Sequence, residues 1–263
     1  MEEALSSDPQ MQASSRAALL FVAATLGQAL GDVESTQGMI EECMKIYGAL
    51  GDDMGFYYAS GTAGLIAVGQ GRYEEGLGLM EESGERRLEM GDAWPAGAMF
   101  GFSATVALGL GDRARARTLA ERSLSLGREV GASELVALAL ATTARSDGDL
   151  AVAAGLFEEG LVLSTEVGDR TNAAYHLEAL AEISAEEDEL ERSARLWGAA
   201  AALRETIEVI AYPHAADRTF YDRQLATVRR RLGDRAWEEA TAEGHAMTLE
   251  EAVGYALDRE TAL

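Results

Sequence analysis

Residues 91–131 read GDAWPAGAMFGFSATVALGLGDRARARTLAERSLSLGREVG, two segments of helical length with Gly111-Asp112 between them. A glycine just past the end of a helix takes the left-handed backbone conformation without a Cβ penalty. An aspartate after it can cap the next helix, because its carboxylate accepts free backbone N–H groups. We therefore interpret this stretch as two antiparallel helices, at 94–110 and 113–130, that are joined by a minimal turn.

The same Gly-Asp pattern recurs and divides most of the chain into helical hairpins. It stands at Gly31, Gly51, Gly148 and Gly168, and Gly71-Arg72 is a variant of it. The pattern predicts helices at 12–30, 33–50, 53–70, 73–90, 94–110, 113–130, 133–147, 149–167, 169–187 and 189–208. They pair into five hairpins, with steps of 40, 40, 37 and 40 residues by subtraction between the turn positions Gly31, Gly71, Gly111, Gly148 and Asp188. A fixed period of about 20–50 residues is typical of a solenoid.

The second helices of the hairpins agree position by position when they are aligned on these turns. Small residues stand five positions after each turn, at Thr36, Gly76, Ala116, Ala153 and Ser193, and twelve after it, at Cys43, Ser83, Ser123, Gly160 and Ala200. Mostly large apolar residues stand eight and nine positions after it, at Met39-Ile40, Leu79-Met80, Leu119-Ala120, Leu156-Phe157 and Leu196-Trp197. These spacings fall on one stripe of a helix. We expect the ten small positions to let neighbouring helices approach closely.

This arrangement resembles the tetratricopeptide repeat, which has a Gly-Asp turn followed by small, large apolar and small residues at these offsets. The best match is Gly148, Asp149, Ala153, Phe157 and Gly160, and Gly64 stands where the family has a first-helix glycine. The repeats are longer than the usual 34 residues, and the family's first-helix Trp and closing Pro are missing. The resemblance implies an all-α, right-handed solenoid of about five hairpins.

Residues 168–258 resemble more narrowly the C-terminal repeats of bacterial ATPase regulators of the LuxR and SARP types. The matching segments are Tyr175–Ala181, Glu191–Ala200, Leu203–Glu205, Leu232–Trp237, Glu243-Gly244 and Met247–Val253. In that family an N-terminal P-loop ATPase switches, a DNA-binding domain acts, and the repeats sense or scaffold. The chain itself contains no Gly-x-x-x-x-Gly-Lys-Ser/Thr motif.

Composition and charge narrow the classes of partner. The chain has 263 residues and a formal net charge of −23, which disfavours general nucleic-acid binding and attraction to an acidic membrane. Cys43 is the single cysteine, so neither an intrachain disulfide nor a cysteine-based zinc site can form. The N-terminus lacks the pattern of a signal peptide, and no apolar run reaches the length of a membrane helix. We expect a cytoplasmic protein.

The repeat period stops after residue 208, and the remaining segment is predicted to close the solenoid. We expect helices at about 214–232, 234–243 and 249–258, with a capping box from Thr248 and Glu251 at the start of the last. Solenoids need such ends to cover an otherwise open core. The predicted organisation is a flexible N-terminus at 1–11, helical repeats at 12–208 and a helical cap at 209–263.

Few residues in the chain suggest chemistry. Cys43 could be a redox switch, but it occupies a small position, which favours packing. His176, His214 and His245 lack metal-ligand spacing. The run Arg229–Arg231 could contact phosphate, and the last three helices could form a helix-turn-helix, although acidic neighbours and an apolar cap core favour a structural role. We predict no catalytic residue, no metal site and no cofactor.

Aromatic residues on the first helices are the candidate binding residues. By resemblance to the family, these helices line the concave face, where aromatic side chains suit partner recognition. Core packing is the alternative for the same group, and the sequence leaves both open. The candidates are Phe56, Tyr57, Tyr58, Phe100, Phe102, Tyr175 and Glu178.

The leading functional hypothesis is a non-enzymatic scaffold that binds a protein or peptide, as the C-terminal sensor or interaction region of a bacterial transcriptional regulator. The negative charge favours a partner with basic residues. The alternative is a small-molecule sensor with a pocket between the concave wall and the cap. An enzyme is disfavoured because no nucleophile, base or metal set converges. Direct nucleic-acid or membrane binding is not expected, and homo-oligomerisation is left open.

Overall fold

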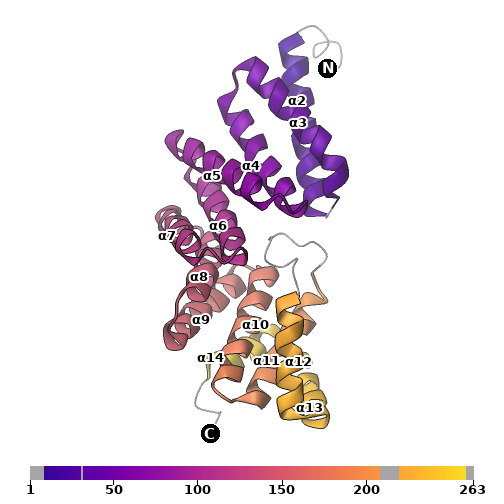
Figure 1. The fold of residues 1–263 in the computed structure, drawn as a ribbon, viewed down its shortest axis with the longest axis vertical. Helices are drawn as coiled ribbons and strands as arrows, with labels where there is room; N and C mark the ends of the chain where they lie inside the picture. Colours follow the sequence, from indigo (N-terminus) through magenta and orange to yellow (C-terminus); the bar gives the residue numbers. More distant parts are fainter. Residues whose placement is uncertain (1–8, 31, 208–218, 259–263) are drawn as a thin grey trace.

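The computed structural model describes residues 9–30, 32–207 and 219–258, and these contain thirteen helices and no strand (Figure 1). The repeat helices are α2 (Pro9–Ala29), α3 (Val33–Leu50), α4 (Asp53–Gly69), α5 (Tyr73–Glu89), α6 (Ala93–Gly109), α7 (Arg113–Val130), α8 (Ser133–Ser146), α9 (Leu150–Glu166), α10 (Arg170–Glu186) and α11 (Leu190–Arg204). Three further helices follow, α12 (Thr219–Leu232), α13 (Asp234–His245) and α14 (Leu249–Leu257). The all-helical prediction is confirmed.

Helix boundaries lie close to the predicted ones, with two differences. α11 ends at Arg204 rather than at 208. The Thr206 hydroxyl donates a hydrogen bond to the Leu203 carbonyl at 2.6 Å, and the Thr206 N–H bonds to the same oxygen at 3.1 Å, so the chain turns there. α12 begins at Thr219. The predicted start at 214 and His214 lie outside the described residues.

Most of the glycine turns form as local chemistry predicts, although Gly148 does not adopt a positive φ. Gly51 and Gly131 adopt φ of 67° and 69° as helix C-caps, a region that favours glycine. Asp52 and Asp112 accept backbone N–H groups of Gly55 and Arg115, at 2.9 and 3.1 Å, and so cap the following helices. The predicted capping box of Thr248 and Glu251 is also present.

The small positions are where helices meet, as predicted from the repeat. All ten of these residues are buried. α4 and α5 cross at Gly64 and Gly76, where a Cβ on Gly64 would lie 2.8 Å from the Gly76 carbonyl oxygen and a Cβ on Gly76 would lie 2.7 Å from that of Gly64. Only residues without a Cβ permit this approach, which fixes the register of the hairpin.

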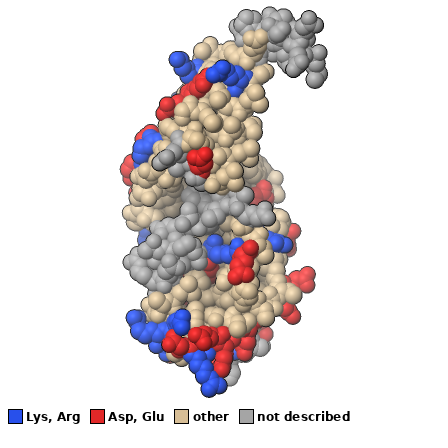
Figure 2. Space-filling model, turned by 90° about the vertical axis from the view of Figure 1, so that its right-hand side faces the viewer, with Lys and Arg blue, Asp and Glu red and all other residues tan. Residues whose placement is uncertain are grey.

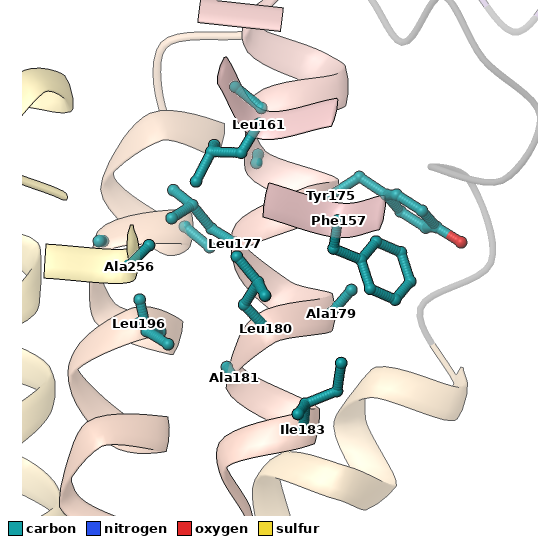
Figure 3. Close-up of a cluster of buried hydrophobic side chains, with 14 of the residues drawn as sticks. Phe157, Leu161, Tyr175, Leu177, Ala179, Leu180, Ala181, Ile183, Leu196 and Ala256 are labelled. Atoms are coloured by element: carbon teal, nitrogen blue, oxygen red, sulfur yellow. The ribbon is translucent and has the colours of Figure 1, made fainter. Parts of the chain in front are cut away.

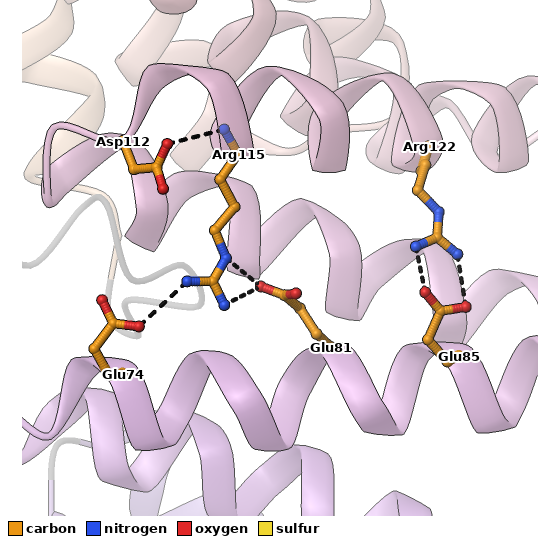
Figure 4. Close-up of polar contacts among 6 residues, drawn as sticks. All are labelled: Glu74, Glu81, Glu85, Asp112, Arg115 and Arg122. Atoms are coloured by element: carbon orange, nitrogen blue, oxygen red, sulfur yellow. Dashed lines mark hydrogen bonds and ion pairs between the residues drawn. The ribbon is translucent and has the colours of Figure 1, made fainter.

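The hairpins stack into an elongated, curved molecule with two walls (Figure 1). The second helices α5, α7 and α9 form the outer wall, and the first helices α4, α6 and α8 lie on its inner side. Ion pairs tie α5 to α7 on the outer wall: Arg115 contacts Glu81 at 2.8 Å and Glu74 at 3.2 Å, and Arg122 holds both oxygens of Glu85 (Figure 4). Such exposed pairs contribute about 0–1 kcal/mol each, so apolar packing dominates.

The C-terminal helices share one core with the last two hairpins. Phe157 from α9, Leu177 and Leu180 from α10, and Leu196 from α11 pack with Ala256 from α14 (Figure 3). Arg192 on α11, 7% exposed, donates to the carbonyl oxygens of Ala256 and Asp258, both at 2.8 Å. α12–α14 therefore cover the C-terminal end of the repeats. Within the described residues, no helix is long and apolar enough to cross a membrane.

Candidate functional site

The first helices bring a row of aromatic and polar side chains across the inner wall. The ring of Phe21 on α2 meets that of Tyr58 on α4 edge-on, with centroids 6.2 Å apart. Further along, the hydroxyl oxygens of Thr105 on α6 and Thr142 on α8 lie 3.3 Å apart. Each of these contacts joins one first helix to the next.

Tyr58 is held in a packed cluster rather than presented freely. Its hydroxyl donates to the carboxylate of Asp92 at 2.6 Å, and the Arg87 guanidinium lies 3.8 Å from the centre of its ring. Burial, followed by the bond to Asp92, raises the pKa of the Tyr58 hydroxyl. Asp92 makes no side-chain capping bond to α6, although the Gly-Asp pattern predicts one. Its carboxylate instead binds Tyr58 and so joins the hairpin of α4 and α5 to the hairpin of α6 and α7.

A second cluster joins α8 to α10. The Nε of Arg145 donates to the Tyr175 hydroxyl at 2.6 Å, and its two Nη atoms donate to Glu182 at 2.9 and 3.2 Å. The Arg145 and Glu182 side chains are 17% and 15% exposed, so the pair is reachable from solvent but largely enclosed. Burial raises the pKa of the Glu182 carboxyl, and the charge of Arg145 opposes that rise.

The seven candidate binding residues separate into two groups. Phe56, Tyr57, Tyr58 and Phe102 are half-buried. Phe100, Tyr175 and Glu178 are buried, so these three side chains do not lie open on a concave surface. The reason is geometric: a first helix contacts its own second helix and both neighbouring hairpins, so only a narrow stripe of it remains open.

Glu178 nevertheless lines a hollow of about 420 Å³ between α10 and α11 on one side and α12 and α13 on the other. We call this hollow the cap pocket. The Glu178 carboxylate, 1% exposed, receives two hydrogen bonds from Arg204, from Nε at 2.6 Å and from Nη2 at 2.7 Å. The other described lining residues are Trp197, Gly198, Ala201, Leu225, Trp237, Glu238, Thr241, Ala242 and His245.

Close contact between α11 and α13 builds one wall of the cap pocket. A Cβ on Gly198 would lie 2.1 Å from the Thr241 carbonyl oxygen, and a Cβ on Gly244 would lie 1.9 Å from that of Arg195. The side chain of Arg195 pairs with Glu243 at 2.7 Å beside this crossing. The two glycines therefore let the helices touch.

The cap pocket suits a ligand with an apolar or aromatic body. Trp237 and Leu225 are half-buried and offer apolar area to the pocket, whereas Trp197 is only 3% exposed. The Glu178 carboxylate is paired with Arg204 through both oxygens and is 1% exposed, so it adds little charge to the surface of the pocket. A more open hollow of about 520 Å³ lies beside α13 and α14, where Met247 and Tyr255 line it together with the carboxylates of Glu243, Glu251 and Asp258.

The other candidates for chemistry have structural surroundings. His176 is fully buried, and burial together with the nearby charge of Arg145 lowers the pKa of its imidazole to about 3. His245 lies 3.2 Å from Glu205 at the surface. Arg229 pairs with Asp234 at 2.6 Å, and Arg231 with Asp188 at 2.7 Å. Among the described residues no cluster of three or more potential metal-ligating side chains occurs.

Sequence reasoning missed the arginines that organise the site. Arg145 and Arg204 meet Glu182 and Glu178 across gaps of 37 and 26 residues. A signal was present, since charged residues on otherwise apolar first helices need partners when buried. The repeat period of about 37–40 residues would have suggested that Arg145 and Glu182 are neighbours.

Comparison with known proteins adds no identification. No protein-family model matches the chain, and a search of curated proteins found no match.

Proposed function

We propose that the chain is a non-enzymatic helical-repeat scaffold that binds a protein or peptide segment and receives one large partner side chain in the cap pocket. The observation that supports this most is the composition of that pocket, in which Trp197 and Trp237 lie near the hydrogen-bonded carboxylate of Glu178. An apolar pocket of this kind can anchor a side chain. The inner wall that leads to it can accommodate an extended segment.

The partner's chemistry follows from charge. A net charge of −23 favours a segment that carries basic residues and speeds its association at low salt. The resemblance of residues 168–258 to the LuxR-type and SARP-type regulators leads us to place this scaffold, as part of the proposal, in the C-terminal sensor or interaction region of a bacterial transcriptional regulator.

Photo-crosslinking from inside the cap pocket tests the proposal. A photoreactive phenylalanine analogue is introduced at Ala201 or Ala242, two exposed residues of the lining, and cells that produce the chain are irradiated. We expect a covalent adduct with a polypeptide from both positions. The same analogue at Ala114, an exposed residue of α7 on the outer wall, is the matched control and should give none.

Filling the cap pocket gives an independent measure. Ala201→Phe and Ala242→Phe should lower the yield of crosslinking from the other position by at least about tenfold, because a ring would occupy the space of the partner side chain. Ala114→Phe should leave the yield unchanged. Undiminished crosslinking in both filled variants would place the partner elsewhere and overturn the proposal.

A small-molecule sensor is the second candidate, and the volume of the cap pocket favours it. Sites for small ligands span about 300–1,000 Å³ and are mostly apolar with a few polar groups, and the cap pocket, at about 420 Å³, falls in that range. The crosslinking experiment separates the two functions. An adduct that adds only the mass of a small compound to the chain supports the sensor and argues against a peptide partner.

A further inference from the structure

The outer face of α2 carries an uncovered apolar stripe. Leu19, Val22, Leu26 and Leu30 are 73%, 52%, 60% and 72% exposed. Their spacing of three or four residues places Leu19, Val22 and Leu26 on one side of the helix, with Ala18 and Ala23 beside them and Leu30 one residue past the helix end. Elsewhere in the described chain the large exposed apolar side chains lie near helix ends, as at Met54, Met90, Leu110, Val130 and Val167. The α2 stripe is therefore unlike the rest of the surface.

The repeat shows what this face does in later hairpins. Leu19 and Leu26 stand twelve and five positions before the turn at Gly31. The residues at the same two positions are Ala59 and Ile66 in the second hairpin and Met99 and Val106 in the third. Those later residues are at most 7% exposed. Ala59 and Ile66 pack with Ile40 and Cys43 of the first hairpin, and Met99 and Val106 with Leu77 and Met80 of the second. The α2 stripe thus corresponds to a face that packs against a helix elsewhere in the molecule.

The charges around the stripe suit a second copy of the chain. Residues 9–30 contain no acidic residue, and their single basic residue, Arg16, is paired with Glu42 of α3. Two chains of net charge −23 repel each other over most of their surface. Across two α2 helices no carboxylate of that segment would face another. In the view of Figure 2 the upper, N-terminal part of the molecule is mostly uncharged, in contrast to the lower end.

The opposite end of the solenoid does not offer a matching surface. α14 contributes Ala252 and Ala256 to the C-terminal core, with Trp237 and Leu249 packed against it. Head-to-tail stacking would need an open helix face at that end, and the cap covers it. A closed dimer through the same surface on both copies avoids this requirement.

We propose that two copies of the chain pair through antiparallel α2 helices in a two-fold symmetric dimer. The centre of the stripe lies between Val22 and Leu26, so the symmetry brings Val22 of one copy to Leu26 of the other and Leu19 to the end of the other α2 at Ala29, beside Leu30. The spacing of these residues is that of helices that pack side by side. This interface is separate from the cap pocket and does not depend on the proposed partner.

Sedimentation equilibrium of the full chain over about 1–100 µM tests the pairing. We expect a mass that rises toward twice the 28.0 kDa of one chain. Leu26→Glu should raise the dimer dissociation constant at least about 100-fold, because each copy would bury a carboxylate against the apolar side chain of Val22 in the other copy. Leu110→Glu, at an exposed apolar residue outside the stripe, is the matched control and should leave that constant unchanged. Circular dichroism should be the same for all three proteins, since both positions face solvent.

A cysteine near the axis gives a second readout. In a Cys43→Ala background, Ala23→Cys should form a disulfide between copies under mild oxidation, whereas Ala114→Cys on the outer wall should not. A chain that stays monomeric up to 100 µM would overturn the proposal. So would a dimer that survives Leu26→Glu unchanged, because its interface would then lie outside α2.

Discussion

Cys43 shows how a repeat position decides the chemistry of a side chain. It is fully buried at a small position, its Sγ donates to the Ala17 carbonyl at 3.3 Å, and burial raises the pKa of the thiol to about 11. The thiolate is the reactive form. Both accessibility and ionisation therefore protect the sulfur while the hairpin stays closed, which fits packing better than redox sensing.

We expect Cys43 to react with a thiol reagent at pH 8 at least about 100-fold more slowly in the folded protein than in urea, where the pKa returns to about 8.5. The release of chromophore from an aromatic disulfide reagent measures both rates. Complete labelling of the folded chain within the time of the urea control would contradict this reading and reopen the redox hypothesis.

The buried imidazole of His176 makes the stability of the protein depend on pH. Its folded pKa of about 3 lies below the value of about 6.5 for a free histidine, so the unfolded chain binds the proton more readily between these values. Stability is retained above pH 6.5 and is lost as the pH falls toward 3. Urea titrations should show the free energy of unfolding to fall by about 1.4 kcal/mol between pH 7.5 and 5.5.

His176→Leu should reduce that pH dependence, whatever the absolute stability of the variant at any one pH. His245→Leu, at a surface residue, is the control and should keep the wild-type dependence. Equal pH dependence in wild type and His176→Leu would show that other groups account for the loss.

At the scale of one helix, substitutions at two glycines of α5 distinguish the effect of close packing from the effect of helix propensity. A Cβ on Gly76 would meet Val68 Cγ2 at 2.6 Å and the Gly64 carbonyl oxygen at 2.7 Å, whereas a Cβ on Gly78 would meet nothing within 4 Å. Gly76→Ala should destabilise the protein by about 1–3 kcal/mol through overpacking. Gly78→Ala should stabilise it by about 0.5–1 kcal/mol, because alanine favours the helix. Urea melts of both variants measure the difference, and changes of the same sign would disprove the register.

The helices and turns were predictable because their causes are local. A glycine with positive φ, an aspartate three residues before a free N–H, and small residues at fixed offsets all act within one hairpin, as at Gly51, Asp52 and Gly76. The candidate site was less predictable because its contacts cross hairpins. The Asp92 carboxylate accepts a hydrogen bond from Tyr58 on another helix instead of capping its own helix. The Phe100 ring packs against the guanidinium of Arg122, which lies 3.8 Å from the ring centre. Neither contact can be predicted from the sequence of one repeat alone.

At the scale of the whole molecule, the two ends differ in how they are held. The C-terminal core joins residues from α8 to α11 with residues of α14 in one cluster, whereas the first hairpin's core, around Ala17, Ile40 and Cys43, extends only to α4 and α5. Each hairpin of a solenoid is stabilised mainly by its neighbours. The N-terminal hairpin has a neighbour on one side, while the last hairpin lies between α9 and the cap. Opening should therefore begin at the N-terminal end.

Hydrogen exchange followed by mass spectrometry should show this gradient, with the slowest amides in α9–α11 and the fastest helical ones in α2 and α3. Leu26→Glu serves as the background, so that pairing of α2 helices does not protect them. Ile40→Ala leaves a cavity that costs about 2–5 kcal/mol, and it should speed exchange in α2–α4 while α9–α11 keep their rates. Leu177→Ala, in the C-terminal core, should instead speed exchange across α9–α11 and α14. If Ile40→Ala accelerated all helices alike, the molecule would unfold as a single cooperative unit, and the division into a weakly held N-terminal end and a capped C-terminal end would be wrong.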